Sequence, residues 1–373
     1  MKKHIVLFAF LSVILLAARS SASERFLKDV FSDSFKVGVA LNADQITGAD
    51  SASLDLSLAH FDSLVAENAM KWGSLNPEPG VYDFRVADAL VDLAEREGLF
   101  LVGHTLLWHQ QTPDWVFLDE KGETATRELV LARLETHIRT VVGRYQGRVQ
   151  GWDVVNEALN EDGSLRESKW LQIIGPDYIE LAFRMAKEAD PDAELYYNDY
   201  NVSKPGKRGG VVRLLGELQA KGVKVDAVGI QGHYSLGHPE LDQLEASISA
   251  ITEAGAPIMI TELDVSVLPF PDAEQMGADV SLSFEMQDHL NPYADGLPEA
   301  VSQQLAERYA AIFEVFLRHQ SHIDRVTFWG VHDGVSWWNY WPIAGRTDYP
   351  LLFDRELKRK AAFEAVVDLA EGR

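Results

Sequence analysis

One pattern restricts the fold of this chain more than any other: short apolar segments alternate with amphipathic segments from about residue 36 onward. The apolar segments are four or five residues long and several are rich in β-branched residues, which is typical of buried strands. The predicted strands are Lys36–Ala40, Ser63–Ala66, Phe100–Gly103, Gly151–Val155, Glu194–Tyr197, Ala227–Ile230, Ile258–Thr261 and Arg325–Trp329.

The segments between the predicted strands have helical periodicity, and helices tend to end in a glycine turn, as at Gly98 and Gly222. Eight strands that alternate with helices predict an α/β protein, a single (β/α)8 TIM barrel with its active site at the C-terminal ends of the strands. A doubly wound open sheet is the alternative, but no glycine-rich dinucleotide fingerprint follows the first strand. The strongest helix predictions are Arg85–Glu97, Glu128–Tyr145, Tyr178–Glu188, Gly210–Lys221, Leu241–Ala254, Pro298–His319 and Arg355–Glu371.

The first residues have the pattern of an export signal. A basic start, Met1–His4, precedes the apolar run Ile5–Ala18, and small residues follow it. This run is too short to span a bilayer comfortably, so an uncleaved anchor is the less favoured alternative. We therefore expect residues 1–23 to be a secretory signal peptide and residues 24–373 to be one catalytic domain. The mature protein would be secreted or periplasmic and without a membrane anchor.

Composition excludes several classes of function. The 373 residues include no cysteine, which excludes disulfides, iron–sulfur clusters, thiolate–zinc sites and cysteine catalysis. The formal net charge of −23 gives a surface that repels nucleic acid, so no nucleic-acid partner is expected. A neutral polymer such as a polysaccharide is compatible with this charge. We expect a monomer that uses no cofactor.

Two of the predicted strands end in a glutamate. Val154 and Val155 lead into Asn156 and Glu157, and a second strand delivers Glu262 about a hundred residues later. Two carboxyl groups at the ends of two parallel strands suit the cleavage of a glycosidic bond, because one can protonate the leaving oxygen while the other attacks or activates water. Either glutamate alone could merely cap a helix or form an ion pair.

Polar and aromatic residues also follow nearly all of the remaining predicted strands. Tryptophans offer flat apolar faces on which a pyranose ring can stack, and a lysine beside Glu67 and Asn68 suits sugar hydroxyls. A metal site built from histidines is the alternative, but the HExxH spacing of zinc sites is absent, so no metal is expected. The strand-end candidates are Glu67, Asn68, Lys71, His104, Trp108, Asn156, Glu157, Tyr200, Gln231, His233, Glu262, Asp264, Trp329 and Trp337.

Several of these residues lie in longer motifs that resemble glycoside hydrolase family 10. The resemblance extends from about residue 26 to the C-terminus and keeps all the motifs in order. The chain departs from the family pattern at Gln110, where serine is more frequent, and in the long segment Val265–Pro298. The motifs are Glu67–Trp72, Gly103–His109, Trp152–Glu157, Gln231–His233, Thr261–Asp264, Phe328–Gly330 and Pro350–Asp354.

The resemblance implies a retaining endo-1,4-β-xylanase that acts on xylan and xylo-oligosaccharides through a covalent glycosyl-enzyme intermediate. By motif, Glu157 is the expected acid/base and Glu262 the nucleophile. We expect His233 to donate a hydrogen bond to Glu262, and Asp264 to orient His233. The charge of Glu262 is expected to raise the pKa of Glu157. Asn156 is expected to bind the sugar 2-hydroxyl, and the predicted substrate-binding residues are Glu67, Asn68, Lys71, His104, Trp108, Tyr200, Gln231, Trp329 and Trp337.

Two other functions fit parts of the pattern. A related barrel glycosidase could cut β-1,4-glucan or mannan instead of xylan. From a different class, a polysaccharide-binding protein could use an inactive barrel. The presence of both glutamates together with His233 and Asn156 disfavours the binding protein.

Overall fold

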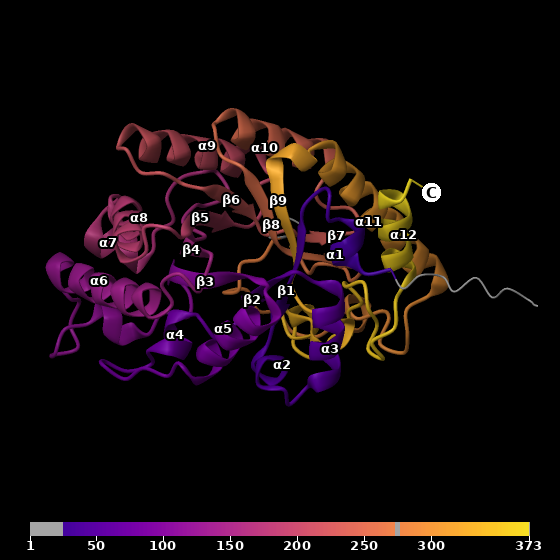
Figure 1. The fold of residues 1–373 in the computed structure, drawn as a ribbon, viewed down its shortest axis with the longest axis horizontal. Helices are drawn as coiled ribbons and strands as arrows, with labels where there is room; N and C mark the ends of the chain where they lie inside the picture. Colours follow the sequence, from indigo (N-terminus) through magenta and orange to yellow (C-terminus); the bar gives the residue numbers. More distant parts are fainter. Residues whose placement is uncertain (1–24, 273–276, 373) are drawn as a thin grey trace, which may run out of the picture.

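The strands form a closed barrel of parallel strands (Figure 1). The computed structural model describes residues 25–272 and 277–372, so the predicted signal peptide lies outside the described residues. The sheet order is β6-β5-β4-β3-β2-β1-β9-β8, and pairing of β6 with β8 closes it. The strands are β1 (Lys36–Leu41), β2 (Ser63–Ala66), β3 (Phe100–Trp108), β4 (Gly151–Asn156), β5 (Glu194–Asp199), β6 (Ala227–Ile230), β7 (His233–Ser235), β8 (Ile258–Ser266) and β9 (Ile323–Phe328).

The short strand β7 continues β6 after a break of two residues, Gln231 and Gly232. It pairs in parallel with β8 beyond the break, with His233 opposite Asp264. Gly232 takes a positive φ of 86°, a conformation that glycine adopts without steric cost. Since β6 and β7 together occupy one position in the barrel, there are eight strand positions, and the predicted (β/α)8 barrel is confirmed.

Helices surround the barrel on its outside (Figure 1). The two longest, α6 and α11, bury one face of apolar side chains against neighbouring elements. The helices are α1 (Leu27–Val30), α2 (Ala43–Thr47), α3 (Ser51–His60), α4 (Trp72–Leu75), α5 (Arg85–Glu97), α6 (Arg127–Arg144), α7 (Lys169–Ile174), α8 (Tyr178–Ala189), α9 (Pro205–Ala220), α10 (Leu241–Glu253), α11 (Glu299–Arg318) and α12 (Ala361–Ala370).

Four predicted boundaries were wrong by more than two residues. Strands β3 and β8 each run five residues past their predicted ends, to Trp108 and Ser266. Helix α9 begins at Pro205 instead of Gly210, because proline is favoured in the first turn, where its missing N–H costs nothing. Helix α12 begins at Ala361 instead of Arg355. The intervening residues form a turn in which the Asp354 carboxylate accepts two backbone N–H groups.

The core has two parts. A large cluster lies between the strands and the helices, and a small cluster fills the barrel interior. The interior cluster includes Tyr196 and Met259, with the buried Arg325 against the Tyr196 ring. In this fold, chemistry takes place at the C-terminal end of the barrel, beyond this packed interior.

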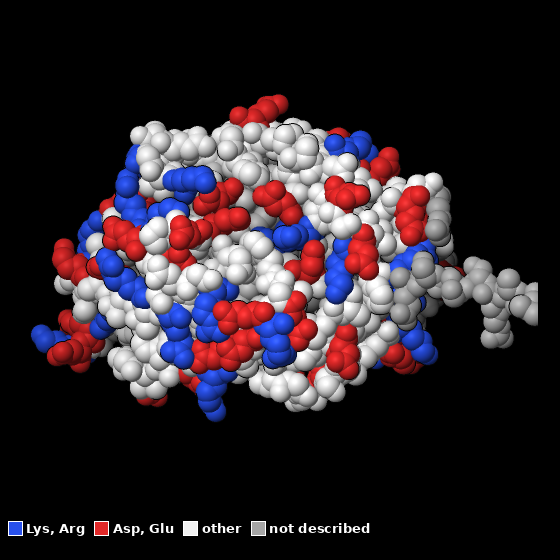
Figure 2. Space-filling model, in the orientation of Figure 1, with Lys and Arg blue, Asp and Glu red and all other residues white. Residues whose placement is uncertain are grey.

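Acidic and basic side chains are interleaved on the face seen in Figure 2. Among the ion pairs of the protein are those of Arg148 with Asp92 and Glu95. Among the described residues, no helix combines the length and the apolar composition that crossing a bilayer requires.

Candidate active site

A cavity at the C-terminal end of the barrel collects most of the predicted site residues. All of them line it except Asp264 and Tyr200. Gln111, Ala278 and Val280 also line it and were not predicted. The lining residues are Glu67, Asn68, Lys71, His104, Trp108, Gln111, Asn156, Glu157, Gln231, His233, Glu262, Ala278, Val280, Trp329 and Trp337.

Glu157 follows the last residue of β4 and takes a positive φ of 56°, which is uncommon for a residue with a side chain. Its carboxyl group is buried, with a relative exposure of 4% for the residue. Trp108 Nε1 donates to Oε2 at 2.8 Å, and Gln231 Nε2 donates to Oε1 at 2.9 Å. Asn156 Nδ2 lies 3.3 Å from Oε1. These donors fix the direction of the carboxyl group.

Burial raises the pKa of Glu157 to about 7, and the carboxylate of Asp199 adds to the rise ahead of Glu262. The expected cause, the charge of Glu262, is therefore only a minor contribution. The physical reason is that removal of the carboxylate from water penalises its charged form more than one neighbouring charge does. A carboxyl group with this pKa is partly protonated at neutral pH.

The pKa of Glu262 is shifted in the opposite direction to that of Glu157. His233 Nε2 lies 3.1 Å from its Oε2, and Asn198 Nδ2 donates to its Oε1 at 2.8 Å. Burial alone would raise the pKa of Glu262, but the hydrogen bond from His233 and the nearby His104 outweigh it and lower the pKa below its usual value. Glu262 is consequently ionised at neutral pH.

The imidazole of His233 lies between two carboxylates. Its Nδ1 is 3.0 Å from both carboxylate oxygens of Asp264, as expected from the sequence. Burial lowers the pKa of His233, but Asp264 and Glu262 overcome this and raise it to about 10. Asp264 also accepts hydrogen bonds from the indole N–H groups of Trp337 and Trp338, each at 2.8 Å. Asp264 thus lies behind the cavity wall, where it orients three rings.

Asn198, near the end of β5, was not among the predicted site residues. It is fully buried, and its Nδ2 donates to Asn156 Oδ1 at 2.9 Å as well as to Glu262. Its own Oδ1 accepts from the Thr261 hydroxyl at 2.6 Å. Because Asn156 contacts Glu157, these two amides connect the two glutamates. Its position at a strand end was the signal that could have identified it.

Lys71 is almost completely buried at one side of the cavity. Its Nζ donates to Asn68 Oδ1 at 3.0 Å, and Asn68 Nδ2 donates to Glu67 Oε1 at 3.1 Å. Burial lowers the pKa of Lys71, while Glu262 and Glu67 oppose this effect. His104 Nδ1 contacts Asp153 Oδ2 at 2.8 Å. The arrangement presents donors and acceptors to a ligand with many hydroxyl groups.

Residues 26–369 match the model of the family described as Glycosyl hydrolase family 10. The chain belongs to this family. Endo-1,4-beta-xylanase A of Xylanibacter ruminicola is 44% identical over 96% of this chain and 97% of its own length. Exoglucanase XynX of Acetivibrio thermocellus is 40% identical over 92% of this chain, which corresponds to 29% of that protein. A solved GH10 endoxylanase retrieved from a sugarcane soil metagenome has a TM-score of 0.88 at 41% identity and covers 92% of this chain and 99% of that one.

In this member of glycosyl hydrolase family 10, Tyr200 lies behind the cavity and not on its surface. The residue is 5% exposed, and Arg166 Nη2 donates to its hydroxyl at 2.7 Å. Lys207 Nζ is 3.5 Å from the ring centroid, and a Cβ atom added at Gly277 would lie 3.3 Å from the ring.

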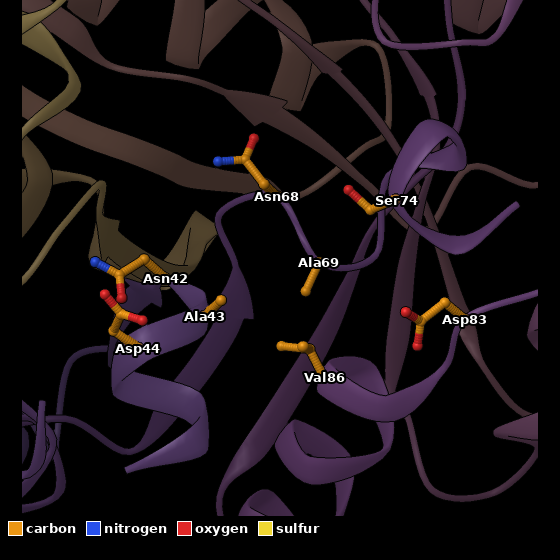
Figure 3. Close-up of a pocket in the computed structure, with 8 residues that line it drawn as sticks. All are labelled: Asn42, Ala43, Asp44, Asn68, Ala69, Ser74, Asp83 and Val86. Carbon is orange, nitrogen blue, oxygen red and sulfur yellow. The ribbon is translucent and has the colours of Figure 1, made fainter. Parts of the chain in front are cut away.

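Asn68 also lines a second pocket next to the first, between the start of α2 and the start of α5. Figure 3 shows that Asp44 and Asp83 lie on opposite sides of this pocket. Asp83 accepts hydrogen bonds from Arg85, whereas Asp44 is exposed. Asn68 therefore lines both the cavity that contains the two glutamates and this second pocket.

Proposed function

We propose that this protein is a retaining endo-1,4-β-xylanase that hydrolyses internal bonds of xylan by double displacement. One observation carries the proposal: two glutamates that line one cavity have pKa values shifted in opposite directions, raised for Glu157 and lowered for Glu262. A proton donor and an ionised carboxylate are the two groups that this reaction requires. The similarity to Endo-1,4-beta-xylanase A supports xylan as the substrate.

In the first step, Glu157 transfers its proton to the glycosidic oxygen as the carbon–oxygen bond breaks. Glu262 attacks the anomeric carbon from the opposite face and forms a glycosyl ester. In the second step, Glu157 is ionised and takes a proton from water, whose oxygen attacks the anomeric carbon. The ester bond breaks, Glu262 regains its negative charge, and two inversions leave the anomeric configuration unchanged.

The surrounding residues have supporting roles in this proposal. His233 donates to Glu262 and keeps the attacking oxygen in place, and Asp264 fixes the direction of the imidazole. Asn156 binds the sugar 2-hydroxyl, an interaction that strengthens in the transition state. The predicted sugar-binding groups on the cavity wall are Glu67, Asn68, Lys71, His104, Trp108, Gln231, Trp329 and Trp337.

We further propose that residues 1–23 direct export, so that the mature domain of residues 24–373 meets xylan and xylo-oligosaccharides outside the cell or in the periplasm. The domain acts as a monomer without a cofactor. Glu157 is the acid of the first step and the base of the second, and Glu262 is the nucleophile of the first step and the leaving group of the second.

The test compares polysaccharides under identical conditions. Release of reducing ends should be much faster from xylan than from carboxymethylcellulose or mannan, and internal cleavage should lower the viscosity of the xylan solution early. Faster release from carboxymethylcellulose would instead favour a glucanase, the alternative suggested by the similarity to Exoglucanase XynX. Retention of the protein by xylan in an affinity gel, without any released sugar, would favour a binding protein.

A further inference from the structure

A buried ion pair lies behind Glu157 and has no part in the two chemical steps. Asp199 is the last residue of β5, Lys207 belongs to the first turn of α9, and both are fully buried. Lys207 Nζ lies 2.8 Å from Asp199 Oδ1. Burial of two charges carries a large desolvation cost, so a pair at this depth calls for an explanation other than stability.

The pair is connected to the backbone that carries the acid/base. The second carboxylate oxygen of Asp199 accepts a hydrogen bond from the Tyr197 hydroxyl. That hydroxyl oxygen in turn accepts from the backbone N–H of Ala158 at 3.2 Å, directly after Glu157. Since Glu157 has a positive φ, its turn needs support from the surrounding structure. The chain of contacts from Lys207 to Ala158 provides such support.

A second connection reaches the carboxyl group itself. The backbone N–H of Gln231 donates to the carbonyl oxygen of Asp199 at 3.0 Å, and the side chain of Gln231 donates to Glu157 Oε1 at 2.9 Å. Asp199 therefore contacts residues that hold both the backbone and the carboxyl group of Glu157.

We propose that Asp199 and Lys207 form a positioning unit for Glu157, which fixes the turn that carries it and holds one negative charge behind its carboxyl group. This inference rests on the proposed role of Glu157 as the acid/base. Asp199 and Lys207 act through Tyr197, Ala158 and Gln231 and do not touch the substrate.

The charges around Glu157 support this assignment. Burial and then the Asp199 carboxylate raise its pKa, with a smaller rise from Glu262. Arg166, on the loop after β4, and Lys71, after β2, are cations that interact electrostatically with Glu157, and so does the Tyr200 hydroxyl. Burial raises the pKa of Asp199, and Lys207 opposes that rise, which favours the ionised form of Asp199.

The test is the variant Asp199→Asn, which removes the charge and keeps the shape. Without that negative charge, the pKa of Glu157 should fall. The acid must be protonated for activity. As the pH rises, kcat/KM on xylohexaose should therefore begin to fall at a lower pH in this variant than in the native protein. We expect the basic limb of the pH profile to move down by about one pH unit. A role confined to folding would change the melting temperature but would leave the limb in place.

Two further variants make the result decisive. Glu161→Gln removes an exposed carboxylate that lies 3.6 Å from Lys207, so it is the matched control and should leave the profile unchanged. Asp199→Asn combined with Lys207→Met removes both buried charges. This double variant should be more stable to unfolding than Asp199→Asn. The basic limb of its pH profile should still lie at a lower pH than in the native protein.

The inference would be overturned if the basic limb of Asp199→Asn lay at the same pH as that of the native protein. If the single variant does not fold, the same comparison is made with the double variant. This outcome is distinct from failure of the proposed function, in which the native protein itself would release no sugar from xylan.

Discussion

At the scale of single residues, the two glutamates differ because of the hydrogen-bond donors that each one receives. Glu262 receives a donor from the positively charged imidazole of His233 and one from the amide of Asn198. Glu157 receives only neutral donors, the Trp108 indole and the amides of Gln231 and Asn156, and the nearby Asp199 carboxylate raises its pKa further. A cationic donor favours a carboxylate much more strongly than neutral donors do, which is why equally buried groups reach different protonation states.

A pH profile of kcat/KM on xylo-oligosaccharides should therefore be bell-shaped. The nucleophile must be ionised, so activity should be lost as the pH falls through the lowered pKa of Glu262. The acid must be protonated, so activity should be lost as the pH rises through about 7, the pKa of Glu157. Initial rates measured from acid to mildly basic pH check both limbs. A profile that stays flat well above neutral pH would contradict the assignment of Glu157.

Substitution of each glutamate should separate their roles. Glu157→Ala should slow xylan hydrolysis by about 10²–10⁴-fold, since the poor leaving group is no longer protonated. An aryl xylobioside with an acidic phenol should still form the glycosyl ester, which azide should convert to the β-glycosyl azide. Glu262→Ala should be inactive on both substrates, and any azide product should be the α-anomer.

Proton NMR of the azide products checks this prediction. If Glu157→Ala produced the α-azide and Glu262→Ala the β-azide, the two roles would be exchanged.

Strand-end motifs were sufficient to predict most of the cavity wall, because a parallel barrel brings all such ends together. They did not indicate that Tyr200 would lie outside the cavity lining, because its ring packs near Lys207 and Gly277, residues from segments with no motif. The dominant effect of burial on the pKa of Glu157 was also missed. Burial depends on the packing of distant segments, which no local pattern encodes.

At the scale of secondary-structure elements, the packing of β3 against β4 requires a glycine at one position. Gly103 pairs with Trp152, and a Cβ atom added at Gly103 would lie 2.1 Å from the indole ring. Trp152 is fully buried and cannot move aside freely. Gly103→Ala should therefore lower the free energy of unfolding by about 1–3 kcal/mol through overpacking.

Gly216→Ala is the matched control for this substitution. Gly216 lies inside α9, is exposed, and has no atom near an added Cβ. Alanine favours a helix over glycine, so this variant should raise the free energy of unfolding by about 0.5–1 kcal/mol. Chemical denaturation of both variants gives the comparison. Equal effects of the same sign would show that the Trp152 contact does not limit the strand pair.

Most elements were predicted close to their true bounds, but the long strands β3 and β8 were not. Their final residues, Trp108 and Ser266, follow polar residues such as His104 and Glu262, which resemble the start of a loop. These polar residues remain in the strand because partners on other strands hold them, for example Asp153 on the neighbouring strand β4 with His104. Tertiary partners decide such boundaries.

At the scale of the whole molecule, α12 joins the two ends of the described chain. Phe363 of α12 is fully buried, with its ring 5.4 Å from the rings of His60 and of Phe353. Arg25 forms ion pairs with Glu364 and Asp368 on the same helix. Ring contacts therefore link α12 to the end of α3, and ion pairs link it to Arg25 at the start of the described chain.

These two kinds of contact should differ in strength. Phe363→Ala removes a buried ring and should lower the free energy of unfolding by about 3–5 kcal/mol. Arg25→Ala removes partly exposed ion pairs and should lower it by at most about 1 kcal/mol. Thermal or denaturant unfolding of the two variants checks the ranking. A larger effect for Arg25→Ala would mean that the ion pairs, and not the buried ring, hold α12 in place.

Closure of the barrel pairs Lys36 of β1 with Arg325 of β9, two residues that are far apart in the sequence. During synthesis, β1 emerges early from the ribosome, and one of its edges has no partner until β9 follows. An unpaired strand edge is a template for association with other chains. Pairing over such a sequence distance is slow. The time for which the newly made protein is vulnerable to aggregation is therefore set by the arrival of β9.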